Sequence, residues 1–442
     1  MTRRFYILSG GTFSDIRPHL ALAAPAFGKI GRTLLPLLTE AFVTTGQSDV
    51  TVELVLTRMA LGGTDRDEAS QALLARAGLH DLLTNEDVAQ LLETLTSDPE
   101  TRGIILTTAL TDFNVSCITA NDGWRSSREI GRQFPRLHSR ELHTPETWAL
   151  LLDRAYKLVP HIRKERKDIF LVACKTTTGA TADEQYLEGL ALVKGASCNL
   201  VLGNDLSTRN NVVITPEQAR YHETTDRNEA LRGLAEMIAL RSQLHFTRST
   251  VVPGEAIAWS SELIPETLRT VVDHCIAQGA YKPFNGTTVG HFATRGPDGT
   301  ILTSRRKTNF NELEKIGLVQ IETRGEHEVI AHGFKPSVGG QSQRAIFTEH
   351  PEADCIVHFH CPLKEGSEIP VRSQRPYECG SHECGENTSS GLKAFGKIKA
   401  VMLDQHGPNI VFPRDTDPAE VIRFIEANVN LRGRTDGLAA AA

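Results

Sequence analysis

The chain has 442 residues, which exceeds the usual size of a single hydrophobic core, so we expect two domains. Hydrophobic residues make up 40% of it, as in an ordinary globular protein, and a net charge of −6 gives no electrostatic reason to bind nucleic acid or an anionic membrane. No segment approaches the roughly 20 apolar residues of a membrane span, and the amino end lacks a signal-peptide pattern. The eight cysteines lie mostly in apolar runs, as free thiols do in a reducing compartment. We therefore expect a cytoplasmic protein with no nucleic-acid or membrane partner.

Residues 1–245 alternate short apolar strands with helical patterns. A helix is predicted near 27–43, and a closing helix near 225–241 has Thr225 as its expected N-cap. This alternation predicts an α/β domain with a doubly wound, mostly parallel, Rossmann-like sheet, whose strands lie near 4–11, 50–58, 102–113, 168–177 and 198–205. Residues 246–258 have no clear periodicity and contain Pro and Gly, so we expect a linker there.

Residues 259–432 show a different pattern, in which strands follow one another with turns between them. Helices are expected near 262–280 and 340–349 and from Pro418, and strands near 287–295, 300–304, 317–323, 327–334, 355–360 and 400–412. This order predicts a second domain, of α/β/α type, with a largely antiparallel sheet. Residues 433–442 end in GLAAAA, for which we expect a disordered tail.

Two histidines stand two residues apart in the apolar run DCIVHFHCPL, residues 354–363. A strand has a side-chain period of two, so His358 and His360 should project from one face and could bind one metal ion. The alternative is a pair of ordinary hydrogen-bonded histidines. His406 follows another apolar strand, in LDQHG, and three histidines with an open position suit a Lewis-acidic divalent metal.

Three motifs follow one another in the second half of the chain, and their order is a specific sequence signal: KPSVGG at 335–340, HPEADCIVHFH at 350–360 and LDQHG at 403–407. Over roughly residues 260–430 the chain resembles the class II aldolase/adducin family of metal-dependent aldolases, epimerases and dehydratases. The resemblance implies that His358, His360 and His406 hold a divalent metal, usually Zn²⁺. GHFATRGPDGTILTS at 290–304 resembles the family's substrate and phosphate loops, so the expected substrate-binding residues are Gly290, His291, Thr303, Ser304, Arg305, Arg306 and Ser337.

The chain departs from that family where the family carries its acid/base. The family's Ser-Ser-Glu run is Ser337, Val338 and Gly339 here, so the glutamate is missing, and His291 replaces an asparagine. The stretch PYECGSHECGENT, residues 376–388, offers His382 and Glu383 as a replacement general acid/base. The alternative is a solvated, turn-rich loop.

The amino end, ILSGGTFSDIRPHLALAAPAFGKIG, places two glycines and a threonine after a strand and a Gly-Lys pair before a helix, which lets backbone N–H groups approach phosphate. Residues 5–245 are similar to phosphopantothenoylcysteine synthetase, the nucleotide-dependent ligase of coenzyme A synthesis. The resemblance implies a CTP or ATP site with Mg²⁺. Its expected residues are Gly10, Gly11, Thr12, Gly28, Lys29, Asp112, Phe113, Asn204 and Asp205.

That site is altered as well, because Ala24 replaces the family's active-site asparagine and Arg136, Leu137 and His138 replace its Lys-Ile-Lys element. Losing a hydrogen-bonding group from such a site weakens transition-state stabilisation. We therefore expect a retained nucleotide pocket on a repurposed fold, with a purely supporting scaffold as the alternative.

The main hypothesis is a fused, bifunctional enzyme. A three-histidine metal site performs aldolase-type lyase, dehydratase or epimerase chemistry on a small phosphorylated or anionic carbonyl compound, and the first domain binds a nucleotide. A second hypothesis is an amide-forming, nucleotide-dependent ligase related to coenzyme A biosynthesis, with a structural aldolase-like domain. A third is a non-catalytic sensor of nucleotide and metal. Both resemblances imply a homo-oligomer, dimer or tetramer.

Overall fold

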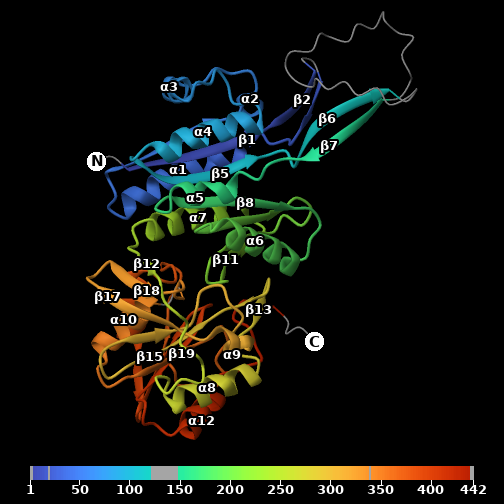
Figure 1. Cartoon of the computed structure of the whole chain (residues 1–442). Coiled ribbons are helices and arrows are strands. Elements are labelled where there is room, and N and C mark those ends of the chain that lie inside the picture. The colour runs from blue at the N-terminus through green and yellow to red at the C-terminus, as the bar shows by residue number, and fades with distance from the viewer. Residues whose placement is uncertain (1–2, 18–19, 121–147, 338–339, 439–442) are drawn as a thin grey trace, which may run out of the picture. The chain divides into compact units, whose positions relative to one another are not determined.

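The computed structural model describes residues 3–17, 20–120, 148–337 and 340–438, and the chain divides into two compact units. The first unit comprises Met1–Ile214 and His222–Ser242, and the second comprises Thr215–Tyr221 and Gln243–Ala442. Figure 1 traces the first unit in blue to green and the second mainly in yellow to red. Within the described residues, no helix is both long and apolar enough to cross a membrane.

The first unit is built on a seven-stranded sheet in the order β11-β10-β9-β8-β5-β1-β4. Five neighbouring strands are parallel, and β10 is antiparallel to β9. The strands are β1 (Arg3–Gly11), β4 (Val50–Leu56), β5 (Thr101–Ala109), β8 (Phe170–Thr177), β9 (Leu200–Asp205), β10 (Asn211–Ile214) and β11 (Arg220–Thr224). The predicted doubly wound, mostly parallel sheet is confirmed. Its strand order reverses between β1 and β5, and ligands of such folds bind at the carboxyl ends of the strands at this point.

Helices connect these strands, and their ends follow the capping rules. They are α1 (Lys29–Thr44), α2 (Arg58–Leu61), α3 (Glu68–Arg76), α4 (Asn85–Ser97), α5 (Val159–Glu165), α6 (Ala182–Ala196) and α7 (Arg227–Arg241). Thr84 and Thr181 start α4 and α6 with complete capping boxes. The N-cap of α7 is Asp226 and not the predicted Thr225, because the Asp226 carboxylate accepts from the N–H groups of Asn228 and Glu229.

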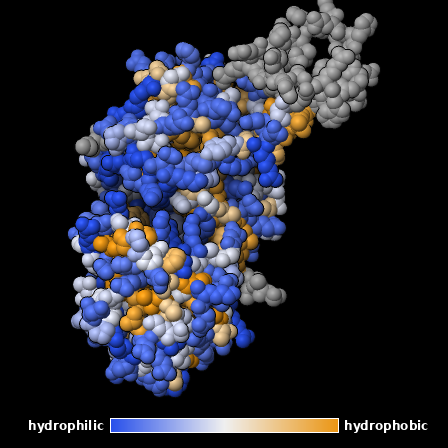
Figure 2. Space-filling view, viewed as in Figure 1, coloured by the Kyte–Doolittle hydropathy of each residue, from blue (hydrophilic) through white to orange (hydrophobic). Residues whose placement is uncertain are grey.

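Two hairpins of the first unit were not predicted from the sequence. They pair β2 (Phe13–Arg17) with β3 (Leu20–Ala23) and β6 (Phe113–Ala120) with β7 (Trp148–Arg154). The second hairpin projects in Figure 1, and Figure 2 shows apolar atoms gathered on it. Leu150, Leu151 and Leu152 of β7 are 37%, 53% and 41% exposed, so this strand lacks the buried face that would have produced a recognisable alternation.

The second unit contains a ten-stranded sheet in the order β12-β18-β17-β16-β15-β19-β23-β22-β20, with β21 beside β22. All its pairings are antiparallel except β12 with β18 and β20 with β22, as the predicted largely antiparallel sheet requires. The strands are β12 (Arg248–Val252), β15 (His291–Arg295), β16 (Ile301–Thr303), β17 (Val319–Arg324), β18 (Glu328–His332), β19 (Cys355–His358), β20 (Val371–Arg372), β21 (Lys393–Phe395), β22 (Ile398–Leu403) and β23 (Gly407–Phe412). A short ribbon of β13 (Pro283–Phe284) and β14 (Thr287–Thr288) lies apart.

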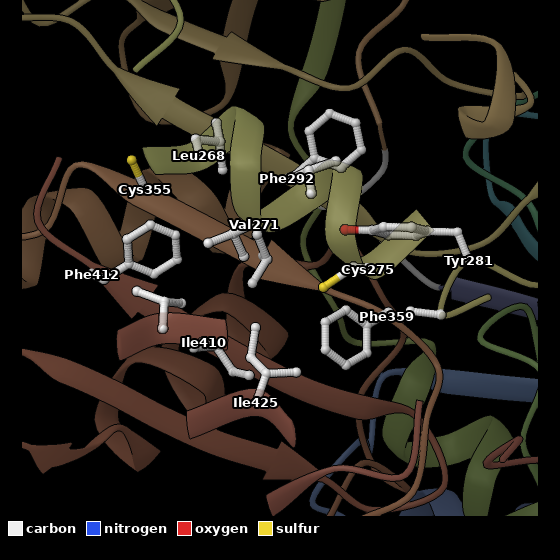
Figure 3. Packing of buried hydrophobic residues seen from close by; sticks show 14 of the residues in the cluster. Leu268, Val271, Cys275, Tyr281, Phe292, Cys355, Phe359, Ile410, Phe412 and Ile425 are labelled. Atoms are coloured by element: carbon white, nitrogen blue, oxygen red, sulfur yellow. The ribbon is translucent and has the colours of Figure 1, made fainter. Parts of the chain in front are cut away.

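The sheet has a hydrophobic core on each face, and successive side chains of β19 point alternately into one core and the other. Val357 and Phe359 belong to the larger core with α8 (Glu266–Ala277) and α12 (Pro418–Asn428), which Figure 3 shows closely packed. Ile356 belongs to the other core, which includes residues of α10 (Gly340–Glu349). His358 therefore lies on the α10 face. The remaining helical elements are η1 (Phe310–Glu312), α9 (Leu313–Ile316) and α11 (His382–Gly391).

Three stretches differ from the sequence-based expectation. Residues 246–258 are not simply a linker, because β12 lies there and pairs with β18; its residues are exposed or half-buried, so they show no apolar periodicity. Residues 400–412 form the hairpin β22–β23, since the chain turns at Asp404–His406. The expected tail makes defined contacts up to 438: Asp436 is 5% exposed and accepts from Arg434 at 2.7 Å. Residues 439–442 lie outside the described residues.

The larger core of the second unit should respond strongly to loss of volume on α12. Ile425 is fully buried there, so Ile425→Ala should lower the free energy of unfolding by about 2–5 kcal/mol. Arg423→Ala, on the exposed side of the same helix, should change it by less than about 0.5 kcal/mol. Denaturant unfolding followed by fluorescence, to which buried Trp259 contributes, compares the two variants. Equal effects would contradict this packing.

Candidate functional site

Two neighbouring strands and one turn bring three histidines of the second unit together. His358 is the last residue of β19 and pairs with Asn409 of β23, while His406 lies in the turn that precedes β23. The strand ends at His358, two residues earlier than predicted, and His360 follows in a bend. Gly407 lets the turn approach β19: its φ is 144°, and a Cβ there would lie 2.1 Å from the Phe359 carbonyl oxygen.

The side chains of these histidines converge and are almost fully buried, with exposed fractions of 1%, 7% and 2% for His358, His360 and His406. The Nε2 atoms of His358 and His406 are 3.3 Å apart. Two nitrogens bound at 2.0–2.1 Å to one tetrahedral zinc would be about 3.3 Å apart. The ring of His360 lies 4.7 Å from that of His406 and 5.2 Å from that of His358, centroid to centroid.

The protonation of His358 also suits a metal ligand. Burial lowers the pKa of His358 to about 4, so the ring is neutral near pH 7. Its Nδ1–H donates to the carbonyl oxygen of Pro408 at 2.9 Å, which leaves the lone pair on Nε2, facing His406. A backbone carbonyl that fixes the ring in this way is the usual outer partner of a metal-binding histidine. The residues present therefore fit a divalent metal that, like zinc, accepts imidazole ligands in tetrahedral geometry.

A fourth imidazole, that of His291, lies beside this cluster. His291 pairs with His358 across β15 and β19, and their ring centroids are 4.8 Å apart. Burial, and then the neighbouring His358, lower the pKa of His291 well below its usual value. Gln343 Nε2 donates to His291 Nδ1 at 3.0 Å, so the neutral ring carries its proton on Nε2. Gly290 precedes it with φ 107°, and a Cβ there would lie 2.4 Å from the His358 oxygen.

Sequence reasoning did not find Gln343. It lies in the first turns of α10 and is fully buried, 52 residues away from His291 in the chain. The only sequence signal was an uncharged polar residue in a short amphipathic helix, and many such residues face solvent.

The other predicted substrate residues lie at and after the end of β16. Thr303 and Ser304 are completely buried, and the Ser304 hydroxyl accepts from the N–H of Phe292 at 3.4 Å. Ser337 N–H donates to the Ser304 carbonyl at 2.9 Å, so these residues do lie together. Arg305 donates to the Ile316 carbonyl at 2.7 Å, and its guanidinium lies 3.4 Å from the centre of the Phe334 ring. Anion recognition by Arg305 and Arg306 remains a prediction.

His382 and Glu383 lie at the start of α11, not in an irregular loop, because Ser381 caps the helix by accepting from Cys384 N–H. Glu383 Oε1 is 2.7 Å from His245 Nδ1, and His382 Nε2 is 3.1 Å from the Thr247 hydroxyl. Within the described residues, His382 also gathers with Glu326 and His327 in a group separate from the three-histidine cluster. Their proton-transfer role remains a prediction.

In the first unit, three of the predicted nucleotide residues, Gly10, Gly11 and Thr12, lie at the carboxyl end of β1. Gly10 has φ 122°, and a Cβ there would lie 2.1 Å from the Thr57 hydroxyl oxygen; a Cβ on Gly11 would lie 2.1 Å from the Ala24 carbonyl oxygen. Thr12 is buried and donates to Asn85 Oδ1 at 2.8 Å. Only glycine allows these close approaches, at the point where the strand order of the sheet reverses.

The remaining nucleotide candidates have different environments. Gly28 caps α1 in the left-handed conformation, with φ 74°, and Lys29 is the exposed first residue of that helix. Asp112 and Lys157 form an exposed ion pair at 2.5 Å, and Phe113 is 45% exposed. The element at Arg136, Leu137 and His138 lies outside the described residues.

Asn204 and Asp205 end β9 and fasten the adjacent loops. Asn204 Oδ1 accepts from the Thr176 hydroxyl at 3.2 Å. The Asp205 carboxylate is fully buried and accepts from the N–H groups of Gly179, Ala180, Ser207 and Thr208 and from the Thr177 hydroxyl. Burial alone would raise the pKa of Asp205, but these donors, Thr208 and Ala180 foremost, outweigh it and hold the pKa below its usual value. The Asp205 carboxylate therefore stabilises the two loops next to the end of β9.

One segment of the second unit matches a known protein family. Residues 274–364 match the family described as the class II aldolase and adducin N-terminal domain. This segment, which contains His291, His358 and His360, is class II aldolase-like. This match confirms the resemblance predicted from KPSVGG and HPEADCIVHFH, which lie inside it, while LDQHG at 403–407 lies beyond the matched residues. Among curated proteins, no relative matches the chain.

Solved structures include neighbours of both predicted kinds. The DNA/pantothenate metabolism flavoprotein from Streptococcus pneumoniae is 17% identical with a TM-score of 0.39, and the match covers 54% of this chain and 98% of that one. The C-terminal domain of the coenzyme A biosynthesis bifunctional protein CoaBC is 13% identical, with a TM-score of 0.35 and coverages of 54% and 94%. L-fuculose 1-phosphate aldolase is 14% identical, with a TM-score of 0.29 and coverages of 38% and 85%. Likeness at these TM-scores is too distant to support an argument about either site.

The Asp205 network predicts a pH dependence. Because the folded-state pKa is lowered, its stabilisation should be fully present above the unfolded value of 3.8 and should be lost as the pH falls through the lower, folded value. Asp205→Asn should therefore destabilise the protein at pH 7, and the difference from the wild type should shrink below pH 4. Exposed Asp65→Asn is the matched control. Thermal unfolding between pH 3 and 7 measures this, and a pH-independent difference would contradict it.

Proposed function

We propose that the C-terminal domain is a divalent-metal-dependent enzyme of aldolase type, a lyase, dehydratase or epimerase. The observation that carries this proposal is the convergence of His358, His360 and His406, with two facing Nε2 atoms 3.3 Å apart in a buried site. These histidines would hold a divalent ion, for which we propose Zn²⁺, and the ion would supply Lewis acidity toward a carbonyl or enolate oxygen. The class II aldolase-like domain supports this reaction class.

The protein's own groups would position and polarise the substrate. His291 offers a neutral Nε2–H donor, fixed by Gln343, toward a developing oxyanion. Thr303, Ser304, Arg305, Arg306 and Ser337 remain the proposed binding groups for a phosphate or carboxylate, which makes a small phosphorylated or anionic carbonyl compound the proposed substrate. The standard glutamate is absent from the sequence at 337–339, so proton transfer needs another group, for which His382 and Glu383 are the proposed residues.

For the first unit we propose nucleotide binding at the end of β1. The close backbone approaches at Gly10 and Gly11, together with the start of α1 at Lys29, support a phosphate site for CTP or ATP with Mg²⁺. A nucleotide-dependent amide ligase with a structural aldolase-like domain is the alternative to the metal enzyme. The homo-oligomeric state and the cytoplasmic location remain predictions.

Metal content tests the central proposal. Purified wild-type protein should contain zinc or a similar metal, and His358→Ala, His360→Ala and His406→Ala should each lose one ion per chain, because three imidazoles hold it. His274→Ala, on α8 and paired with Glu426, is the matched control. Elemental analysis after reconstitution measures this. If each of the three variants kept as much metal as the wild type, the proposal would fail. If each variant lost one ion that the wild type holds, phosphorylated carbonyl compounds should be screened as substrates for cleavage.

Nucleotide binding tests the first unit separately. Calorimetric titration with MgCTP and MgATP should detect binding of one of them, and Lys29→Ala should weaken it at least about tenfold, since a hydrogen bond to a charged group contributes about 1.5–3 kcal/mol. Lys164→Ala on α5 should leave the affinity unchanged. The absence of binding by either nucleotide would leave the first unit as a scaffold.

A further inference from the structure

Within the described residues of the C-terminal domain, a second group of side chains of metal-ligand type shares no residue with the three-histidine cluster. Glu326, His327 and His382 each offer one ligand atom, and these atoms all lie within 4.8 Å of one another. The rings of His327 and His382 have centroids 5.2 Å apart, and His327 Nε2 is 3.7 Å from a Glu326 oxygen.

The fold assembles this group from segments that are distant in sequence. The β17–β18 hairpin pairs Arg324 with Glu328, and its turn, with Gly325 at φ 69°, carries Glu326 and His327. The start of α11 carries His382, whose N–H donates to the His245 carbonyl at 2.8 Å. An isolated antiparallel bridge between Phe246 and Ser381 holds the same two segments together. The backbone therefore fixes the position of His382, while the turn presents its two side chains to it.

Surrounding contacts orient the buried histidine. His382 is 8% exposed, and its Nε2 lies 3.1 Å from the Thr247 hydroxyl, which in turn accepts from Arg344 at 3.3 Å. Glu383 lies next to it and is held by the N–H and ring of His245. Fixing one ring nitrogen through a hydroxyl, with a carboxylate close by, is how outer partners orient metal-binding imidazoles.

The charges near the group favour a cation overall. Two carboxylates, those of Glu326 and Glu383, and one guanidinium, that of Arg344, act electrostatically on His382, and Arg344 donates to the carbonyl oxygens of Gly325 and Glu326. The amino end of α11 contributes about half a positive charge, which the two carboxylates exceed. Burial first, and then His327, lower the pKa of His382.

We propose that Glu326, His327 and His382 form a second divalent-metal site, with two imidazoles and one carboxylate, suited to Zn²⁺, Co²⁺, Ni²⁺ or Cu²⁺. As a ligand of this site His382 does not transfer protons in the aldolase-type reaction, which leaves Glu383 as the proposed proton-transfer residue there. The side chains of Glu326 and His327 are 78% and 66% exposed, so they can close to the ligand spacing of about 3.3 Å that a tetrahedral ion needs without displacing packed neighbours. The fourth position faces solvent and accepts water or a ligand atom. The bound ion joins the β17–β18 turn to the start of α11 and so stabilises this part of the domain.

Metal stoichiometry and cobalt spectroscopy on the full chain test the site. Wild-type protein should bind two ions, and His327→Ala should bind one, with the cobalt affinity of the lost site reduced at least about 100-fold, because removing an outer partner alone costs about 10–100-fold. His327 is exposed, so its substitution leaves the fold intact, and Glu326→Gln should weaken the same site. His332→Ala, on β18 and paired with Glu322, should bind as the wild type does.

The two proposed sites are separable in this experiment. His358→Ala should lose a different ion from the one that His327→Ala loses. Added zinc should raise the unfolding temperature of the His358→Ala variant, and it should raise that of the double variant His358→Ala/His327→Ala by less. One ion in the wild type, with no change in His327→Ala, would overturn the second site while leaving the three-histidine site standing. Two ions with no change in His327→Ala would also overturn it, because the second ion would then lie elsewhere. One ion lost only in His327→Ala would support it and would refute the three-histidine site.

Discussion

The C-terminal site depends on the register of β19 against β23. His358 stands opposite Asn409, and only in that register does the turn before β23 place His406 with its Nε2 3.3 Å from that of His358. A shift of one residue would turn His358 toward the larger hydrophobic core and Val357 toward the site, because side chains alternate across a sheet. Two cores hold this register from both faces, with Val357 on one and Ile356 on the other.

Burying several imidazoles together has an energetic consequence. His291 and His358 have lowered pKa values because charging either would be costly in this desolvated site, and each uses one ring nitrogen in a hydrogen bond within the protein. A protein that needed only a packed core would be more stable with apolar residues there. The group is instead surrounded by glycines at 290 and 407 whose positive φ values bring backbone close to β19. This arrangement is consistent with selection for a ligand-binding geometry over stability alone.

Much of the fold could be read from the sequence because its signals are local. The parallel strands of the first unit are apolar runs between helical patterns, and the three histidines follow from a period of two and a strand end. The strand β12 and the β6–β7 hairpin have exposed faces and so leave no such pattern. The Gln343–His291 contact and the grouping of His382 with Glu326 and His327 join residues more than 50 positions apart, and only the folded sheet and helix positions determine them.

Under the proposed function, the residues at the positions that the resemblance makes catalytic form one coherent change. At the position where the resemblance places an asparagine, His291 carries an N–H whose tautomer Gln343 sets, so in the proposed site it would still stabilise a developing negative charge on oxygen. The sequence at 337–339 supplies no carboxylate, so the capacity to accept a proton at that position is lost. Within the proposed reaction class, this combination favours substrates whose own acidic proton or leaving group lessens the need for a strong protein base. A substrate with an additional electron-withdrawing carboxylate or phosphate near the reacting carbon meets that condition, and Arg305 and Arg306 are the proposed groups to recognise such an anion.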